Sequence, residues 1–326
     1  MGSRLRGNDR IGLRLARIPD EQKPNRASDR VLKAASFDYV RATSVAEACA
    51  LLRTHGDDAK LIAGGQSLVP MMAMRLSRPS QLVDINEIAA LKFVALETNV
   101  ARTGACTRQC VIERDTVLAG RVPLLTQALA WVGHSQTRNR GTVGGSLMHA
   151  DPAAELPLAA QVLGATLMLR SVNGVRALTA AEFFMAPLTT AAKADECLEE
   201  IHWPVWNESR TGSAFTETSR RHGDFAIVAA AAQVAVDAEG RCVRATFGIG
   251  GGSSTPLVFP KIAARLAGTH LDEQTIVDAA HAAAAEVEFS TDLHAGADYR
   301  RHLAETLAAR ALRDARTRAD DRMERK

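Results

Sequence analysis

The sequence lacks several features that would define a class of protein at once. It contains no apolar run of the roughly 18 residues that a transmembrane helix requires, so we expect no membrane span. Its formal net charge is only +3 over 326 residues, which is too small to indicate binding to nucleic acid. The basic excess lies at the two ends of the chain, which we interpret as solvated tails. Aromatic residues make up only 4%, and alanine takes their place in the expected cores.

Metal-binding and export signals are also missing. None of the five cysteines belongs to a Cys-x-x-Cys motif, whereas an iron–sulfur cluster needs four thiolates at close spacing. We therefore expect no metal on this chain. The N-terminus has no apolar segment of signal-peptide length, so we expect a cytoplasmic location. Thiols stay reduced in the cytoplasm. We therefore expect all five cysteines to be reduced and most of them to be buried: Cys49, Cys106, Cys110, Cys197 and Cys242.

The most informative stretch is Arg138–Pro157, RNRGTVGGSLMHADPAAELP. Three glycines stand beside two hydroxyl residues, Asp151-Pro152 marks a helix start, and Glu155 follows one turn later. Glycine lets another backbone or a ligand approach closely, and successive amides in such a loop can converge on an anion. The residues alone therefore indicate a site for a phosphate-bearing ligand. The alternative is a tight turn between two packed elements.

A second stretch of the same kind is Lys60–Leu68, KLIAGGQSL. Leu61-Ile62 has the character of a buried strand end, and Gly64-Gly65 forms the turn. Ser67 then caps a helix that we expect to run to Leu76. Two strand–Gly–Gly–Ser units in one chain predict a ligand with two phosphates, held by both.

These segments resemble a known family. Ala63–Ile85 and Arg138–Pro157 are similar to the two flavin-binding segments of the FAD-binding medium subunit of molybdenum hydroxylases, which include xanthine dehydrogenase and carbon monoxide dehydrogenase. Ser219–Val228, SRRHGDFAIV, resembles the Arg-Arg-x-Gly-Asp-x-Ala signature of its C-terminal domain. The resemblance runs in register from about Lys33 to Leu312.

The resemblance implies which residues hold FAD. Two loops, Ile62–Leu68 and Thr142–Ser146, would give backbone amides and serine hydroxyls to the pyrophosphate. Glu155 would bind a ribose hydroxyl of the adenosine portion; the alternative is that it stabilises a helix N-terminus. No residue is assigned a catalytic or metal-binding role. The expected cofactor-binding residues besides Glu155 are Ile62, Ala63, Gly64, Gly65, Gln66, Ser67, Leu68, Thr142, Val143, Gly144, Gly145 and Ser146.

Some nearby residues have no role that the sequence identifies. Arg138 and Arg140 could neutralise phosphates or face a neighbouring subunit, and His134 and His149 show no acid–base partner. Some family members carry lysine near the flavin shortly before the paired arginines. Thr216, Glu217 and Thr218 stand there instead, so the resemblance gives no cation to this strand.

The expected fold is α+β. Residues 31–208 should form a PCMH-type FAD-binding domain with subdomains 31–90 and 91–208. Residues 209–315 should form an antiparallel sheet with helices on one face, as in the C-terminal domain of the carbon monoxide dehydrogenase flavoprotein. We expect 316–326 to be a tail and 1–30 a disordered extension. Family members begin near Val31, so the extension is a candidate artefact of an upstream start codon.

The resemblance also implies a role in a larger complex. Electrons would leave a substrate at a molybdenum cofactor on a large subunit and cross 2Fe-2S clusters on a small subunit. They would then reach FAD on this chain and pass to a final acceptor, in a dimer of heterotrimers. One alternative is a free-standing flavin oxidoreductase, and another is a flavin-free scaffold subunit. The sequence identifies neither the substrate nor the acceptor.

Overall fold

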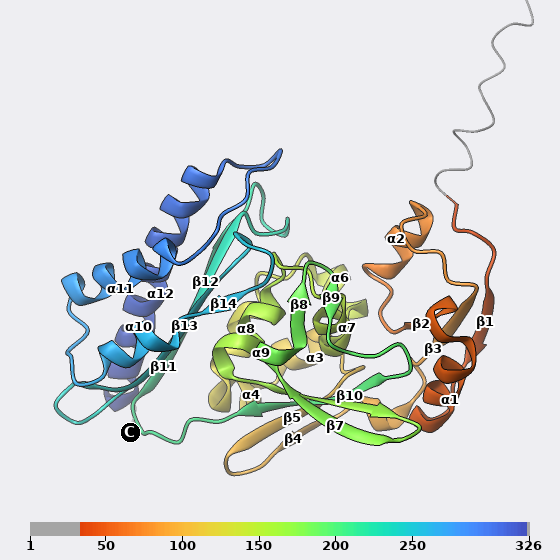
Figure 1. The fold of residues 1–326 in the computed structure, drawn as a ribbon. Coiled ribbons are helices and arrows are strands. Elements are labelled where there is room, and N and C mark those ends of the chain that lie inside the picture. Colours follow the sequence, from red (N-terminus) through yellow and green to blue (C-terminus); the bar gives the residue numbers. More distant parts are fainter. Residues whose placement is uncertain (1–32, 325–326) are drawn as a thin grey trace, which may run out of the picture.

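The chain folds into three lobes that lie in sequence order (Figure 1). The computed structural model describes residues 33–324, so the expected extension 1–30 lies outside the described residues. The N-terminal lobe comprises residues 33–91, the central lobe 92–205 and the C-terminal lobe 211–324. Parallel and antiparallel sheets occur together with helices, which confirms the α+β class.

The N-terminal lobe contains a parallel three-stranded sheet in the order β1-β3-β2. Ser44 caps α1, because its side chain accepts a hydrogen bond from the Glu47 amide. The capping box is only half formed, since the Glu47 carboxylate accepts from the amide and hydroxyl of Thr43. The elements are β1 (Asp38–Arg41), α1 (Val45–His55), a 3-10 turn (Gly56–Asp58), β2 (Ala59–Ile62), α2 (Leu68–Ala73), β3 (Gln81–Asp84) and a second 3-10 turn (Ala89–Leu91).

The central lobe is built on a five-stranded sheet in the order β4-β5-β10-β6-β7, covered by short helices. Its strands are β4 (Val94–Leu96), β5 (Val100–Gly104), β6 (Thr166–Ser171), β7 (Gly174–Thr179) and β10 (Cys197–Pro204), with a separate hairpin of β8 (Phe184–Ala186) and β9 (Thr189–Thr190). Its helices are α3 (Gln109–Arg114), α4 (Thr116–Arg121), α5 (Pro123–Leu129), α6 (Ser135–Arg140), α7 (Val143–His149), α8 (Glu155–Leu163) and α9 (Ala180–Phe183).

Two hairpins, β4–β5 and β6–β7, belong to this sheet. In β6–β7 the pairing of Ser171 with Gly174 leaves Val172 and Asn173 as the two turn residues. The sequence did not predict α4 and α6. Each has only six residues, and SQTRNR in α6 has no apolar periodicity, so neither gives a helical pattern.

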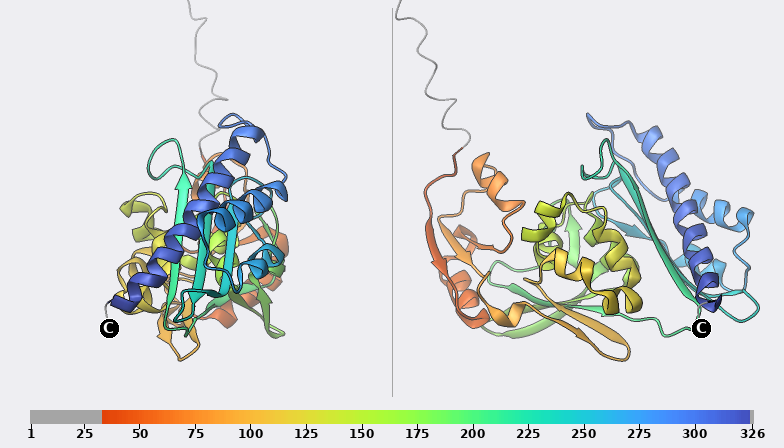
Figure 2. Two further views of the ribbon diagram at one scale, coloured as in Figure 1. Left: turned by 90° about the vertical axis from the view of Figure 1, so that its left-hand side faces the viewer. Right: turned by 180° about the vertical axis from the view of Figure 1, so that it is seen from behind.

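The C-terminal lobe is an antiparallel sheet in the order β11-β12-β13-β14. Its own helices cover one face, with α12 crossing the sheet (Figure 2), and α5 and α8 of the central lobe cover the other. The helices on one face were predicted. The elements are β11 (Thr211–Thr218), β12 (Val228–Val236), β13 (Cys242–Gly250), β14 (Leu257–Val258), α10 (Pro260–Leu266), α11 (Glu273–Ala285) and α12 (Ala297–Glu324).

Residues 316–324 do not form the expected solvated tail. They continue α12, which ends at Glu324. Arg318 donates to the Ser213 carbonyl over 2.7 Å, and Asp320 forms an ion pair with Arg210. These contacts fasten the last turns of α12 to the start of β11, so the segment is part of the C-terminal lobe.

The contact between β11 and α12 predicts a sensitive position at Gly212. A Cβ there would overlap the carbonyl oxygen of Ala315 and lie 2.9 Å from the carbonyl carbon of Arg318. Since backbone atoms cannot rotate away, Gly212→Ala should lower the free energy of unfolding by about 1–3 kcal/mol. Urea unfolding measures this.

Gly120 in α4 supplies the control, because a Cβ there meets no atom within 4 Å. Gly120→Ala should raise stability by about 0.5–1 kcal/mol, as alanine favours the helix. Equal stabilities of Gly212→Ala and the unmodified chain would show that α12 does not pack on β11 in this way.

Candidate functional site

The first glycine segment leaves its amides free. Strand β2 ends at Ile62 and α2 begins at Leu68, so the segment is a tight loop as predicted. Gly65 has a φ of +72°, a conformation that side chains with a Cβ rarely adopt. Among the described residues, the amides of Gly65, Gln66 and Ser67 donate no hydrogen bond, and the Ser67 side chain makes no capping bond to α2. These donors can therefore serve a ligand.

The second segment differs from the expectation. Thr142–Ser146 is not a loop but the first turn of α7, which Thr142 caps by accepting from the Gly145 amide over 3.0 Å. The amide of Val143 donates to Thr107, that of Gly144 to Ala105, and that of Ser146 to Thr142. Four of the five amides expected to face the pyrophosphate are thus already used within the chain. The Ser146 hydroxyl is engaged in no hydrogen bond among the described residues.

The two segments meet through backbone. A Cβ on Gly64 would overlap the Arg140 carbonyl oxygen and lie 2.9 Å from the Arg140 carbonyl carbon. The Arg108 guanidinium donates to that same oxygen and, over 2.8 Å, to Asn86 Oδ1. The Asn86 amide group in turn donates to the Ala63 carbonyl over 2.6 Å. Arg108 and Asn86 therefore join the loop of one lobe to the helix start of the next.

Not every glycine in these segments serves a ligand. A Cβ on Gly144 would lie 2.6 Å from the Ala105 Cβ and 2.7 Å from its carbonyl oxygen. Gly64 and Gly144 are therefore explained by close packing, which was the alternative interpretation of the sequence. Gly65 is different, because its backbone conformation favours glycine while its amide stays free.

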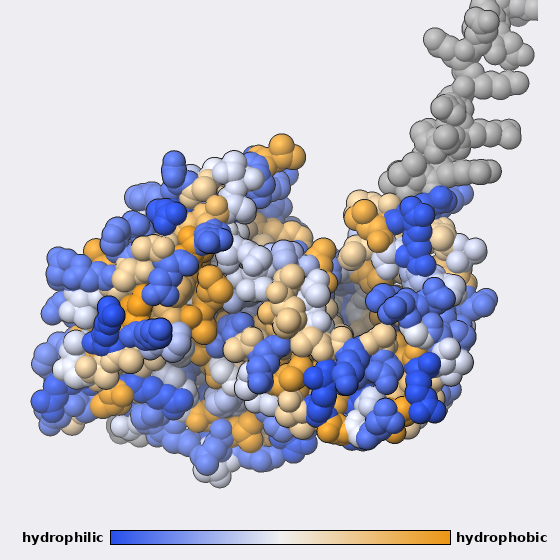
Figure 3. All heavy atoms as spheres, in the orientation of Figure 1, coloured by the Kyte–Doolittle hydropathy of each residue, from blue (hydrophilic) through white to orange (hydrophobic). Residues whose placement is uncertain are grey.

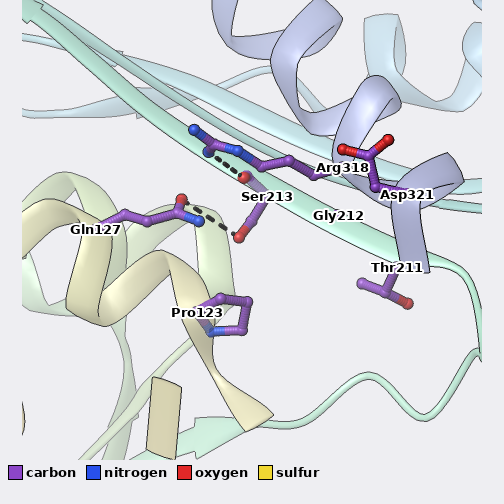
Figure 4. A pocket seen from close by; sticks show the side chains of 7 residues that line it. All are labelled: Pro123, Gln127, Thr211, Gly212, Ser213, Arg318 and Asp321. Atoms are coloured by element: carbon purple, nitrogen blue, oxygen red, sulfur yellow. Dashed lines mark hydrogen bonds between the residues drawn. The ribbon is translucent and has the colours of Figure 1, made fainter. Parts of the chain in front are cut away.

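A notch in the surface marks the place where the two lobes meet. Figure 3 shows it between the part that carries α2 and the central part that carries α6 and α7. A separate cavity of about 220 Å³ lies between α5, β11 and α12 (Figure 4) and contains none of the expected cofactor residues. This cavity is smaller than most sites that hold a cofactor as large as the expected FAD. Its lining residues are Pro123, Gln127, Thr211, Gly212, Ser213, Arg318 and Asp321.

Glu155 is the first residue of α8 and is only 5% exposed. Burial raises the pKa of its carboxyl to about 7, the Asp151 charge adds to this effect, and Arg138 opposes it. Glu217 on β11 is 7% exposed, and burial, followed by the charge of Glu155, raises its pKa to about 8. Two acids from different lobes therefore share an environment in which charge is costly.

Two of the residues whose roles the sequence left open, Arg138 and His134, make contacts within the chain. Arg138 forms an ion pair with Glu113 at 2.8 Å and donates to the carbonyls of Val132 and Gly133, so it fixes the turn before α6. The His134 ring stacks on His222 of the β11–β12 loop at a centroid distance of 6.4 Å. His149 lies in the last turn of α7.

The family comparison agrees with this architecture. Residues 35–206 match the FAD binding domain in molybdopterin dehydrogenase, and residues 213–315 match the CO dehydrogenase flavoprotein C-terminal domain. The chain belongs to the FAD-binding medium subunits of the molybdenum hydroxylase family. Its FAD cofactor and its place among oxidoreductase subunits, both expected from the sequence, are thereby confirmed.

Named relatives of the family cover nearly the whole chain. The 6-hydroxypseudooxynicotine dehydrogenase complex subunit alpha of Paenarthrobacter nicotinovorans is 40% identical over 288 residues, covering 88% of this chain and 97% of the relative. The carbon monoxide dehydrogenase medium chain of Afipia carboxidovorans is 34% identical, covering 87% and 98%.

Solved structures of the family show the same fold. A Cu,Mo-CO dehydrogenase chain superposes with a TM-score of 0.85 at 33% identity, covering 87% of this chain and 99% of that chain. Quinoline 2-oxidoreductase from Pseudomonas putida gives 0.83 at 35% identity, with coverages of 88% and 99%. The two-subdomain architecture followed by a flavoprotein C-terminal domain therefore agrees with solved members.

No helix within residues 33–324 has the length and hydrophobicity that crossing a bilayer would require. In the same range, no group of three or more His, Cys, Asp or Glu side chains is arranged to hold a metal ion.

The family's cofactor fits the chemical groups that the two segments and Glu155 offer. FAD carries a pyrophosphate, which needs hydrogen-bond donors, and hydroxyl groups, which need acceptors. The first glycine segment offers unused amides, Ser67 and Ser146 offer hydroxyls, and Glu155 offers a buried carboxyl. Donors for the phosphates and an acceptor for the hydroxyls are thus both present.

The raised pKa values of the two buried acids predict how stability depends on pH. In the FAD-free chain, the folded state holds more protons than the unfolded state between about pH 4.5 and 8. Its free energy of unfolding should therefore fall as the pH rises through this window. Glu155→Gln and Glu217→Gln should each reduce this pH-dependent loss of unfolding free energy by about 1–3 kcal/mol.

Urea unfolding at pH 5 and pH 8.5 tests this dependence. Glu239→Gln is the matched control, because the Glu239 side chain is 63% exposed on the β12–β13 turn. It should leave the pH dependence unchanged. A fall of equal size in all three variants would mean that the buried acids do not cause it.

Proposed function

We propose that this chain is the flavoprotein component of a molybdenum hydroxylase complex and holds FAD where the N-terminal and central lobes meet. The observation that carries the proposal is the set of unused amides at Gly65, Gln66 and Ser67, placed beside the start of α7 by the Gly64–Arg140 contact. The family to which the chain belongs supports it.

Within this site, the first segment, Ile62–Leu68, would supply the amides for the pyrophosphate. The second segment would supply hydroxyls from Thr142 and Ser146, because four of its five amides are occupied. Glu155 would accept a hydrogen bond from a ribose hydroxyl. Residues 31–208 would accordingly act as the FAD-binding domain, and residues 209–315 as a second domain packed against it.

The proposed role in the complex is electron transfer. When bound, FAD supplies redox chemistry, while the protein supplies its binding, orientation and electrostatic surroundings. The electrons would come from a molybdenum cofactor on a large subunit through 2Fe-2S clusters on a small subunit. A dimer of such heterotrimers in the cytoplasm is the proposed assembly. Relatives described as a complex subunit and as a medium chain support a multi-subunit arrangement.

The FAD site is tested by a substitution at Gly65. Valine there would strain the backbone at a φ of +72° and crowd the side chain of Val69, whose Cγ2 atom would lie 3.1 Å from the new Cβ. Strain and obstruction together should cost on the order of 1–3 kcal/mol, which lowers FAD affinity by roughly 5- to 100-fold. The readout is flavin absorbance per chain after gel filtration.

Gly56 provides a matched control in the same lobe. It also has a positive φ, of +54°, and a Cβ there would meet no atom within 4 Å. Gly56→Val should therefore destabilise the fold without expelling FAD. If Gly56→Val lost the flavin and Gly65→Val retained it, the first glycine segment would not be the pyrophosphate site.

The role in a complex predicts a division of activity. The full chain purified alone should carry flavin but oxidise no substrate, because none of its residues is assigned to substrate chemistry. Expressed together with the neighbouring genes, it should purify with a large and a small subunit, and substrate should then reduce its flavin. Substrate oxidation by the isolated chain would instead support a free-standing flavin enzyme.

A further inference from the structure

Glu217 stands out among the described side chains, because both of its carboxylate oxygens are buried and neither has a hydrogen-bond partner. Other buried atoms without partners belong to side chains of which only one atom is affected. Leaving a buried polar atom unpaired costs about 1–3 kcal/mol, and more when the group carries charge. A carboxyl held this way is suited to a ligand that supplies the missing donors.

Strand geometry shows where Glu217 points. Successive side chains of a strand face opposite sides of the sheet. The Thr216 hydroxyl donates to the Leu307 carbonyl, so Thr216 faces α12. Phe215 belongs to the core of the central lobe, and the Ser213 hydroxyl contacts Gln127 on α5. Glu217 has the same parity as Phe215 and Ser213, and therefore faces the central lobe.

That side carries α8, which packs on the C-terminal sheet, and the charge of its first residue, Glu155, acts on Glu217. Two further charged groups, Asp151 in the turn before α8 and Arg138 on α6, act on Glu155. Asp151 is itself an acid and adds negative charge, and Arg138 is already paired with Glu113. The pair therefore has no cation of its own among the described residues.

A metal ion does not explain the pair, because no third ligand of the His, Cys, Asp or Glu type completes a site within residues 33–324. Hydroxyl groups do explain it, since each can donate one hydrogen bond to a carboxylate oxygen. A polyhydroxylated ligand could satisfy both acids at once.

We propose that Glu217 is the second carboxyl of the FAD site, supplied by the C-terminal lobe, and that Glu155 and Glu217 together accept hydrogen bonds from hydroxyl groups of the nucleotide. The inference rests on the proposed function. It assigns the C-terminal lobe a direct part in holding the cofactor, whereas the resemblance left this strand only without a cation for the flavin. Glu217 takes a binding role and no part in the redox chemistry.

Proton release provides a signature of this arrangement. Without ligand, the pair holds protons near neutral pH because burial raises the pKa of both acids, an effect to which the Asp151 charge adds at Glu155 and the Glu155 charge at Glu217. Hydroxyl donors stabilise the charged form and lower those pKa values. FAD binding at pH 7 should therefore release protons, and affinity should increase as the pH rises from 6 to 8.

The test is calorimetric titration of FAD into the flavin-stripped full chain at pH 7, in two buffers of different ionisation enthalpy. Glu217→Gln and Glu155→Gln should each weaken FAD binding roughly tenfold, by removing a charged acceptor, and should reduce the number of protons released. Glu239→Gln should change neither. Glu217→Asp keeps a carboxyl but shortens its reach, so it should weaken binding and still release protons.

Two further probes separate the possible hydroxyl donors. ADP carries the ribose hydroxyls without the ribityl chain, and FMN carries the ribityl chain without the adenosine. Sensitivity of ADP binding to Glu217→Gln would assign the ribose, and sensitivity of FMN binding would assign the ribityl chain. Thermal unfolding of each variant shows that it is folded before titration.

The outcomes distinguish this inference from the proposed function. If FAD binds the unmodified chain, and Glu217→Gln and Glu217→Asp bind it with the same affinity and proton release, the inference is wrong while the FAD site stands. If FAD fails to bind even the unmodified chain in its complex with partner subunits, the proposed function itself is wrong.

Discussion

The contact on which the site depends is the approach of Gly64 to the Arg140 carbonyl. No side chain with a Cβ can stand there, because the carbonyl occupies the space. Arg108 holds that carbonyl and also reaches Asn86, which bonds to the Ala63 carbonyl. Two glycine segments far apart in the sequence are thereby fixed against each other by a close backbone approach and by the side-chain hydrogen bonds of Arg108 and Asn86. This contact gives the free amides of Gly65, Gln66 and Ser67 a defined position relative to α7.

The second organising feature is the seam between the central and C-terminal lobes. Phe215, Ala229 and Ala231 of the C-terminal sheet belong to the same hydrophobic core as α5 and α8. Because the lobes share one core, the C-terminal sheet forms a wall of the central lobe. Glu155 and Glu217 lie in this seam, where their burial costs folding free energy that the surrounding apolar contacts offset.

The sequence predicted elements whose signals are local and strong. Strand β2 and the antiparallel C-terminal sheet follow from apolar runs and turns. It misplaced the second glycine segment because a Gly-Gly pair has low helix propensity. Tertiary contacts override that preference, since the Thr142 cap and the packing of Gly144 on Ala105 favour the first turn of a helix.

The parts of the site that the sequence could not predict depend on long-range contacts. Arg108 and Asn86 are ordinary polar residues until the fold places one beside the Arg140 carbonyl and the other beside the Ala63 carbonyl. Glu217 could be recognised only as a departure from lysine, and its orientation comes from the register of β11 against β12. A buried acid without a partner weakens the fold and gains nothing from packing. Its position opposite Glu155 is therefore better explained by a bound ligand than by stability.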